Sequence, residues 1–362
     1  MKVNRVNRVL KAMEEKGIPQ LIVSDPVAIF YLTGKWILPG ERLLALYLNT
    51  NGKHKLVINR LFPQEKDLGV DLIWYDDMQD GVQILSQFVE KDKPIGIDKV
   101  WPSRFLIRLQ ELSAGSKFVN GSPLIDYVRM IKDAEEQELM RKSSKINDEV
   151  MEKLLPWAAK GLSENQLNDK ARELYAQAGC EGVSFDPITA YAKGAADPHH
   201  VTDDARGKYG DCVILDIGGR KDNYASDMTR TVFLGKVSER QKEIYNIVLE
   251  AQLRGIKAAK PGSRMCDVDL AARGYIEQKG YGDQFPCRTG HTIGLEDHEF
   301  GDVSSVNTDI IKPGQCFSVE PGIYLPEEEI GVRIEDLVLI TENGCEVLNR
   351  FTKEIIVLPF EG

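Results

Sequence analysis

The sequence predicts an α+β protein of two domains, the second of which has two similar halves. The chain has 362 residues, which is more than one ordinary hydrophobic core accommodates. Hydrophobic residues make up 42% of the chain and charged residues 28%, a composition typical of globular proteins. Strand-like and helical apolar patterns alternate along the chain, and in the second part their order repeats.

Residues 1–126 are expected to form the smaller domain, of mixed α/β type. It starts with an amphipathic helix whose apolar side carries Val6, Val9 and Met13, and Gly17 ends this helix. Helical patterns separate four apolar runs that predict strands, at residues 21–23, 43–48, 56–58 and 72–75.

Residues 127–362 are expected to form the second domain. Asp133 and Glu136 have the spacing of an N-terminal capping box, and helical sequence continues from there to about residue 178. Strands follow to residue 233, helices return over 238–279, and further strands run over 286–348. This order of helix pair, strands, helix pair and strands predicts a pseudo-two-fold axis.

Charge and composition exclude several classes of function. The net charge of −10 and the pI near 5.2 argue against nucleic acid and against anionic membranes as partners. No apolar stretch approaches the roughly 20 residues that span a bilayer, and the first helix lacks the apolar centre of a signal peptide. The six cysteines are scattered singly, so we expect reduced thiols and a cytoplasmic protein.

Histidines and strand-borne acids mark the expected chemistry. Four of the five histidines lie in two short stretches, at 199–200 and at 291 and 298. Asp216 lies near the end of an apolar strand, and Asp227 lies on one face of the next predicted strand. Taken alone, this hairpin is equally consistent with two solvated acids. An ionised carboxylate inside a packed sheet, however, needs a cation or several donors.

Two later apolar strands each carry one more carboxylate, Glu320 and Glu335, and Arg333 shares the face of Glu335. Four carboxylates contribute −4, which two divalent cations balance. One imidazole among carboxylates favours Mn²⁺, Co²⁺ or Fe²⁺ over a thiolate-type zinc site, although Zn²⁺ is also compatible. Two such ions about 3.5–4 Å apart share a water molecule and lower its pKa.

Five segments carry a resemblance to a known family. They are PHH at 198–200, LDIGG with YASDMTRT at 215–231, GHTIGLEDHE at 290–299, SVEPGIY at 318–324 and GVRIED at 331–336. Together they resemble the prolidase (Xaa-Pro dipeptidase) and aminopeptidase P branch of the M24 "pita-bread" metallopeptidases. The resemblance covers essentially the whole chain. It implies a C-terminal pita-bread domain, preceded by a creatinase/prolidase-like N-terminal domain.

The resemblance also implies roles for individual residues. The ligands of two divalent ions per subunit would be Asp216, Asp227, His291, Glu320 and Glu335. Among these, Asp227 and Glu335 would bridge the ions, and Glu320 would also accept a proton from the attacking water. The other expected site residues serve the substrate. They are His298 for the tetrahedral intermediate, His199 for orientation or proton handling, Arg333 for a substrate or product carboxylate, and Phe185 and Ile188 for the proline ring.

The implied reaction is hydrolysis of the peptide bond before proline by a metal-activated hydroxide, in a homodimeric enzyme. The substrate would be a dipeptide or a longer peptide with proline second. Two alternatives stay open: a metal-dependent hydrolase of another small amide, and a non-catalytic binding module. Tyr191, Lys193 and Thr292 depart from the family pattern, Thr292 where glycine is usual, and bear on which substrate is preferred.

Overall fold

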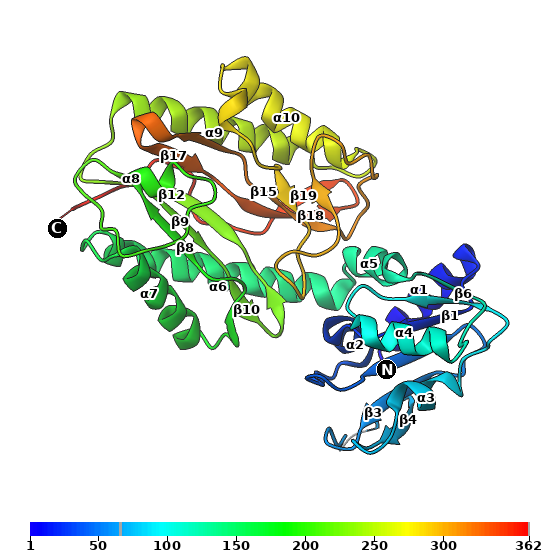
Figure 1. The fold of residues 1–362 in the computed structure, drawn as a ribbon. Helices are drawn as coiled ribbons and strands as arrows, with labels where there is room; N and C mark the ends of the chain where they lie inside the picture. Colours follow the sequence, from blue (N-terminus) through cyan, green and yellow to red (C-terminus); the bar gives the residue numbers. More distant parts are fainter. Residues whose placement is uncertain (65–66, 361–362) are drawn as a thin grey trace. The chain divides into compact units, whose positions relative to one another are not determined.

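The computed structural model describes residues 1–64 and 67–360. The chain divides into two compact units, residues 1–129 and 130–362 (Figure 1). Residue 126, the predicted end of the first domain, lies within the last helix of the first unit.

The N-terminal unit is built on a six-stranded mixed sheet with the order β4-β3-β2-β1-β5-β6. The mixed α/β character expected for this part of the chain is confirmed, because helices accompany a sheet that contains both parallel and antiparallel pairs. Its strands are β1 (Gln20–Val23), β2 (Ala45–Asn49), β3 (Lys55–Asn59), β4 (Asp71–Tyr75), β5 (Pro94–Ile97) and β6 (Lys117–Asn120). The last two were not identified in the sequence.

Five helices accompany this sheet: α1 (Val3–Lys16), α2 (Pro26–Thr33), α3 (Gly81–Ser86), α4 (Ser103–Glu111) and α5 (Ser122–Met130). The first is amphipathic as expected, with Val9 and Met13 fully buried. Gly17 ends it in the left-handed conformation, at φ 65°, which glycine adopts without steric cost.

In the C-terminal unit two helix pairs cover opposite sides of the strands (Figure 1). The pairs are α6 (Ala134–Ala158) with α7 (Glu164–Gln177), and α9 (Glu239–Ala258) with α10 (Met265–Gln278). Capping boxes start α6, α7 and α9 at Asp133, Ser163 and Ser238. A short helix, α8 (Ala192–Ala195), and two 3₁₀ turns, η1 (Gly282–Gln284) and η2 (Pro326–Glu328), complete the helical elements.

The strands of this unit fall into two groups, separated along the chain by α9 and α10. The first group is β7 (Gly182–Val183), β8 (Ile188–Tyr191), β9 (Cys212–Ile217), β10 (Gly219–Lys221), β11 (Tyr224–Ala225) and β12 (Met228–Leu234). The second group is β13 (Gly290–His291), β14 (Asp302–Val303), β15 (Cys316–Val319), β16 (Gly322–Leu325), β17 (Ile330–Arg333), β18 (Asp336–Thr341), β19 (Gly344–Val347) and β20 (Val357–Leu358). The expected order of elements is therefore present.

Three of the acids expected inside strands lie instead where one strand stops and another begins. Asp227 stands between β11 and β12, Glu320 between β15 and β16, and Glu335 between β17 and β18. The chain changes sheet at these points, because β16 pairs with β17 whereas β15 pairs with β18. Period-2 alternation identifies a face of a strand but not the residue at which the chain leaves its sheet.

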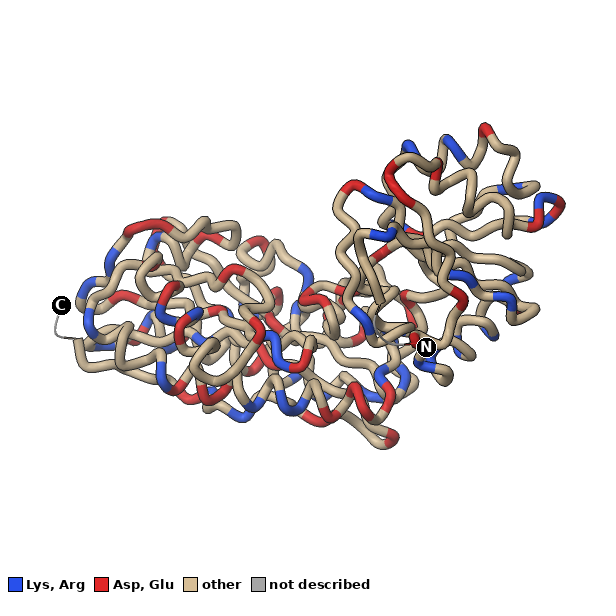
Figure 2. Tube along the Cα trace, turned by 90° about the horizontal axis from the view of Figure 1, so that it is seen from below, with Lys and Arg blue, Asp and Glu red and all other residues tan. Residues whose placement is uncertain are grey.

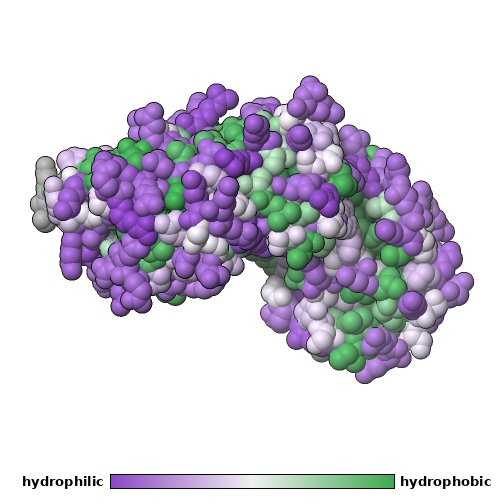
Figure 3. Space-filling model, turned by 90° about the horizontal axis from the view of Figure 1, so that it is seen from above, coloured by the Kyte–Doolittle hydropathy of each residue, from purple (hydrophilic) through white to green (hydrophobic). Residues whose placement is uncertain are grey.

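The surface carries mixed charge. Figure 2 shows acidic and basic residues interspersed along each unit, and Figure 3 shows hydrophilic and hydrophobic groups alternating over the visible face of each. Within the described residues, no helix combines the length and the apolar character that crossing a membrane requires. All six cysteines are free thiols, and Cys212 and Cys316 are buried in strands.

A buried asparagine connects α6 to the strand that carries Asp216. The Asn147 amide donates to the carbonyl of Ile217 at 3.0 Å, and its oxygen accepts from the Tyr175 hydroxyl. We predict that Asn147→Ala lowers the free energy of unfolding by about 2–4 kcal/mol, because two buried polar groups lose their partners. Urea denaturation, monitored by circular dichroism, measures the change in the free energy of unfolding. Lys145→Ala, an exposed change on the same helix, should stay within about 0.5 kcal/mol of wild type.

Candidate metal centre

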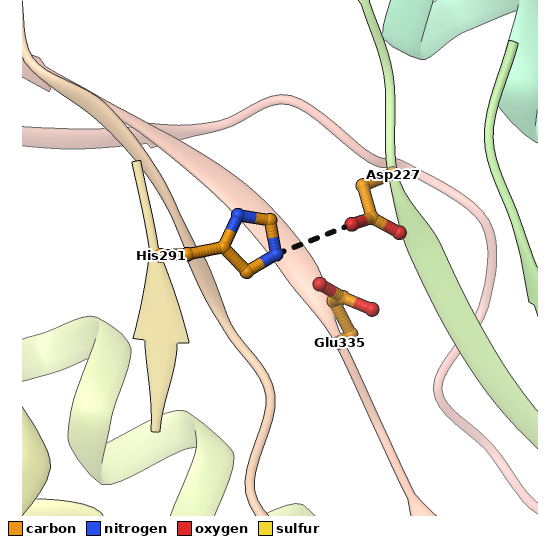
Figure 4. Close-up of side chains that lie close together, drawn as sticks. All are labelled: Asp227, His291 and Glu335. Carbon is orange, nitrogen blue, oxygen red and sulfur yellow. Dashed lines mark ion pairs between the residues drawn. The ribbon is translucent and has the colours of Figure 1, made fainter. Parts of the chain in front are cut away.

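Three buried side chains from separate parts of the C-terminal unit converge on one point. Figure 4 shows Asp227, His291 and Glu335 directed toward one another from three different segments. Each of them offers one ligand atom, and these atoms all lie within 4.8 Å of one another. The three residues are separated by 64 and 44 positions in the sequence (291 − 227 and 335 − 291), so the fold alone brings them together.

The imidazole of His291 is oriented for binding a cation. Its Nδ1 lies 3.3 Å from the carbonyl oxygen of Thr292, so the proton belongs on Nδ1 and Nε2 carries the lone pair. This Nε2 lies 3.4 Å from Asp227 Oδ2 and 3.4 Å from Glu320 Oε1. A nitrogen lone pair that faces two carboxylate oxygens is an arrangement that a positive ion stabilises.

Neighbouring donors hold one carboxylate oxygen in each of Glu335, Glu320 and Asp216. The Thr229 hydroxyl donates to Glu335 Oε2 at 2.7 Å, and the Ser318 hydroxyl donates to Glu320 Oε1 at 3.0 Å. Arg333 Nη2 donates to Asp216 Oδ2 at 2.6 Å. These contacts fix the directions of the carboxylates.

In several of these carboxylates the second oxygen accepts no hydrogen bond. Among the described residues, Asp216 Oδ1, Asp227 Oδ1 and Glu335 Oε1 are buried and lack a hydrogen-bond partner. A buried carboxylate oxygen without a donor is costly unless a cation meets it. The donor set, carboxylate oxygens with one imidazole, is one that binds hard or borderline divalent ions. The residues therefore fit a divalent metal.

The pKa values in the cluster support the same conclusion. Burial, together with the charge of Glu320, raises the pKa of Glu335 well above its usual value, and burial with the charge of Glu335 does the same for the pKa of Asp227. Burial raises the pKa of Glu320 to about 7, and the charge of Asp216 contributes. Acids crowded so that they resist ionisation gain the most from a bound cation.

Arg333 is buried beside the cluster, and three of its nitrogens have partners. Besides Asp216, it donates through Nη1 to the Tyr324 hydroxyl at 3.0 Å and through Nε to Thr229 Oγ1 at 3.2 Å. The resemblance implied that Arg333 pairs with a carboxylate of the substrate or product. That role stays a prediction, whereas the contacts of the side chain are those of a group that positions Asp216.

His298 stacks on His291, with the ring centroids 3.8 Å apart. Arg288 Nη2 lies 3.0 Å from its Nδ1, so Nδ1 accepts and the ring proton lies on Nε2. Partial burial, with the charges of His291 and Arg288, lowers the pKa of His298 to about 4. The imidazole is therefore neutral at pH 7 and carries an N–H that can be donated.

The second histidine stretch has a different environment. His199 is exposed, and its backbone N–H donates to Asp197 Oδ1 at 2.9 Å. Its neighbour His200 places Nε2 2.6 Å from Oε2 of the buried Glu164, an ion pair when the imidazole is protonated. The substrate role of His199 stays a prediction.

Phe185 and Ile188 both lie beside Asp216. Ile188 is directly opposite Asp216 in the pairing of β8 with β9, and the Phe185 ring lies next to Gly218, two residues after Asp216. Both side chains are partly exposed. Their role in binding the proline ring stays a prediction.

The departures from the family pattern have structural partners. The Tyr191 ring is buried and its hydroxyl donates to the carbonyl of Leu162 at 2.8 Å. Thr292 is fully buried and its hydroxyl donates to the carbonyl of Phe300 at 2.6 Å. Lys193 lines a cavity of about 670 Å³, whose lining includes His200 but none of the five expected ligands.

Asp297 belongs to the same cluster but was not selected from the sequence. Its Oδ2 lies 3.3 Å from His298 Nε2, and its carboxyl lies within hydrogen-bonding reach of the Asp227 carboxyl. Burial raises the pKa of Asp297 to about 6, and the charge of Asp216 contributes. The available signal was an acid directly before His298, in a motif already expected to supply ligands.

The fold and the cluster together define a metal-dependent hydrolase of the pita-bread type, and comparisons with known proteins identify its family. Residues 138–342 match the model of metallopeptidase family M24, and residues 5–131 match the creatinase/prolidase N-terminal domain. The chain belongs to metallopeptidase family M24. The resemblance noted in the sequence and the expected fold class are confirmed.

Relatives extend over nearly the full length of the chain. An uncharacterized peptidase of Staphylococcus aureus strain MW2 is 32% identical over 97% of this chain and 100% of its own length. The prolidase of Pyrococcus horikoshii is similar with a TM-score of 0.89 and 30% identity, covering 98% of this chain and 100% of that one. The Xaa-Pro dipeptidase of Bacillus anthracis has a TM-score of 0.89 and 29% identity, covering 99% and 100%.

We predict that adding Mn²⁺ to chelator-treated protein raises its melting temperature. A ligand that binds only the folded state at 100 times its Kd stabilises that state by about 2.7 kcal/mol. For a unit of this size the shift is roughly 5–10 °C. Differential scanning calorimetry measures it. The same concentration of K⁺ serves as the control, and an identical melting temperature with and without Mn²⁺ would contradict the metal centre.

Proposed function

We propose that this protein hydrolyses the peptide bond before proline in Xaa-Pro dipeptides or at the start of longer Xaa-Pro peptides, and that it uses two divalent ions. The observation that carries the proposal is the cluster around His291, with its buried, donor-free carboxylate oxygens. The proline specificity is supported by the similar solved structures, which are a prolidase and an Xaa-Pro dipeptidase.

The ions would be held by Asp216, Asp227, His291, Glu320 and Glu335. The favoured metal at both positions is Mn²⁺ or Co²⁺. When bound, they would lower the pKa of a water molecule and offset negative charge that develops on the scissile carbonyl oxygen. The structure supports this assignment because the side chains of all five residues lie in one cluster and influence each other's ionisation.

Two residues handle protons and charge at the scissile bond. Glu320 has one oxygen fixed by Ser318 and stays partly exposed, so it can accept the proton of the attacking water. The neutral ring of His298 carries its proton on Nε2, which lies 3.3 Å from Asp297 Oδ2. It can donate this N–H to the carbonyl oxygen as negative charge develops there.

The proline ring requires an apolar surface, because its imide nitrogen has no N–H for the site to bind. Phe185 and Ile188 supply such a surface beside Asp216. His199 would orient the substrate from the neighbouring loop. The preference between dipeptides and longer peptides, the homodimer and the cytoplasmic location stay predictions.

We predict that the metal-loaded protein hydrolyses Ala-Pro and leaves Ala-Ala intact, because only proline fills the apolar surface without needing a donor partner. Asp227→Asn should lose both bound metal and activity, since it removes one charge from the centre. Mass spectrometry of bound metal and a proline-release assay measure the two effects. Asp222→Asn, a change at a partly exposed residue in the preceding hairpin, is the control.

The outcomes of this assay separate the alternatives. Turnover of other amides with no preference for Ala-Pro would indicate a metal-dependent hydrolase of another small amide. Full metal occupancy without turnover of any peptide would indicate a binding module. Adding Ala-Pro-Ala to the panel distinguishes a dipeptidase from an aminopeptidase.

We predict that His298→Ala keeps its metal but loses kcat by about 10²-fold, the usual scale for removing a group that stabilises developing charge. Steady-state kinetics with Ala-Pro, together with metal analysis, checks both parts. His54→Ala, in the N-terminal unit, should match wild type. Unchanged kinetics in His298→Ala would remove this residue from the mechanism.

A further inference from the structure

Asp297 occupies a position between two residues that the proposed function uses. It lies in the loop after β13, six residues beyond His291 and directly before His298. Its Oδ2 is 3.3 Å from His298 Nε2, and only 17% of its side chain is exposed. This exposure is close to that of Glu320, at 20%, so Asp297 belongs to the cluster and not to the outer surface.

The other oxygen of Asp297 lacks a hydrogen-bond partner. Within the described part of the chain, Asp297 Oδ1 and Asp227 Oδ1 are both buried and without a donor, and the two carboxyl groups lie within hydrogen-bonding reach of each other. Two ionised carboxylates cannot satisfy each other, because neither has a proton to donate. A cation that both groups contact removes the conflict.

The charge of the centre also leaves a place for one more acid. The five expected ligands contribute −4, but Asp216 is paired with the buried Arg333, which adds +1. Two divalent ions then bring the formal total to +1. Ionised Asp297 brings that total to zero with a neutral water molecule, so the balance is closed by a residue that already contacts the cluster.

We propose that Asp297 is a sixth protein group of the metal centre, which shares a bound cation with Asp227. The proposal rests on the metal centre of the proposed function and extends its ligand set. Oδ2 of the same side chain lies 3.3 Å from His298 Nε2, so one carboxylate would connect a metal position to the group that stabilises the developing charge.

Asp297→Asn tests the proposal because it keeps the shape of the side chain and removes its charge. Glu296→Gln is the matched control, since it removes one acidic charge from the adjacent position. Asp227→Asn is the reference for loss of an expected ligand. All four proteins, including wild type, are stripped with chelator, dialysed and titrated with Mn²⁺ by isothermal calorimetry.

We predict that Asp297→Asn weakens the binding of at least one Mn²⁺ by about 10–100-fold, the range measured when groups around a metal are removed. Glu296→Gln should bind as wild type does. If Asp297→Asn binds Mn²⁺ at both metal positions with the affinity of wild type, the inference is overturned. If Asp227→Asn also binds Mn²⁺ normally, the metal centre itself fails, so the two failures are distinguishable.

Melting temperatures separate a ligand from a residue that only supports the loop. As a ligand, Asp297 repels the other acids when no metal is bound, so metal-free Asp297→Asn should melt at or above the wild-type temperature. The rise in melting temperature on adding Mn²⁺ should be smaller for Asp297→Asn than for wild type. Metal-free Asp297→Asn could instead melt below wild type and show the same rise in melting temperature with Mn²⁺ as wild type does. That result would show a structural role for Asp297 and overturn the proposal.

Discussion

The crowding of negative charge around His291 is the constraint on which the rest of the C-terminal unit depends. Burial and mutual repulsion raise the pKa values of Asp227 and Glu335, so the acids oppose their own convergence. The unit offsets this repulsion in part by donating a hydrogen bond to one oxygen of a carboxylate. The second oxygen has no hydrogen-bond partner and is available to a cation, as at Glu335 and Asp216. The packed strands and helices hold the acids together, and a cation makes their convergence favourable.

The sheet breaks serve the same purpose. A residue in the middle of a paired strand has its backbone direction set by both neighbours, whereas a residue between two strands can aim its side chain elsewhere. Asp227, Glu320 and Glu335 all occupy such breaks. The backbone at Glu335 is still fixed, because its carbonyl accepts from the buried Arg230 at 2.6 Å and its N–H donates to the carbonyl of Thr229.

Sequence patterns predicted the local features of the fold well. The capping boxes at Asp133, Ser163 and Ser238 involve residues three apart, so their geometry follows from the sequence itself. The strand β5 was missed because Pro94 and Gly96, residue types uncommon in strands, interrupt its apolar residues, and β6 was missed because it has no fully buried side chain to mark it. Short strands depend on their neighbours in the sheet, which the sequence does not display.

The candidate site was predictable as a set of residue types but not as a set of contacts. Motifs identified the five expected ligands, while the pairing of Arg333 with Asp216 joins positions 117 residues apart. A long-range pair of this kind follows only from the fold. Asp297 was overlooked for the opposite reason: it stands next to His298 in a short acidic stretch, where a solvated acid is the ordinary expectation.

The donors that hold the carboxylates differ in charge, and this difference makes the two proposed ion positions unequal. Glu335 and Glu320 are held by neutral hydroxyls, which orient an oxygen while leaving its negative charge available to a cation. Asp216 is held by a guanidinium, which offsets part of its charge. An ion beside Asp216 therefore meets less negative charge than one beside His291 and Glu320. A further carboxylate within reach of Asp227 would add negative charge to the centre, and Asp297 is an acid that the fold places there.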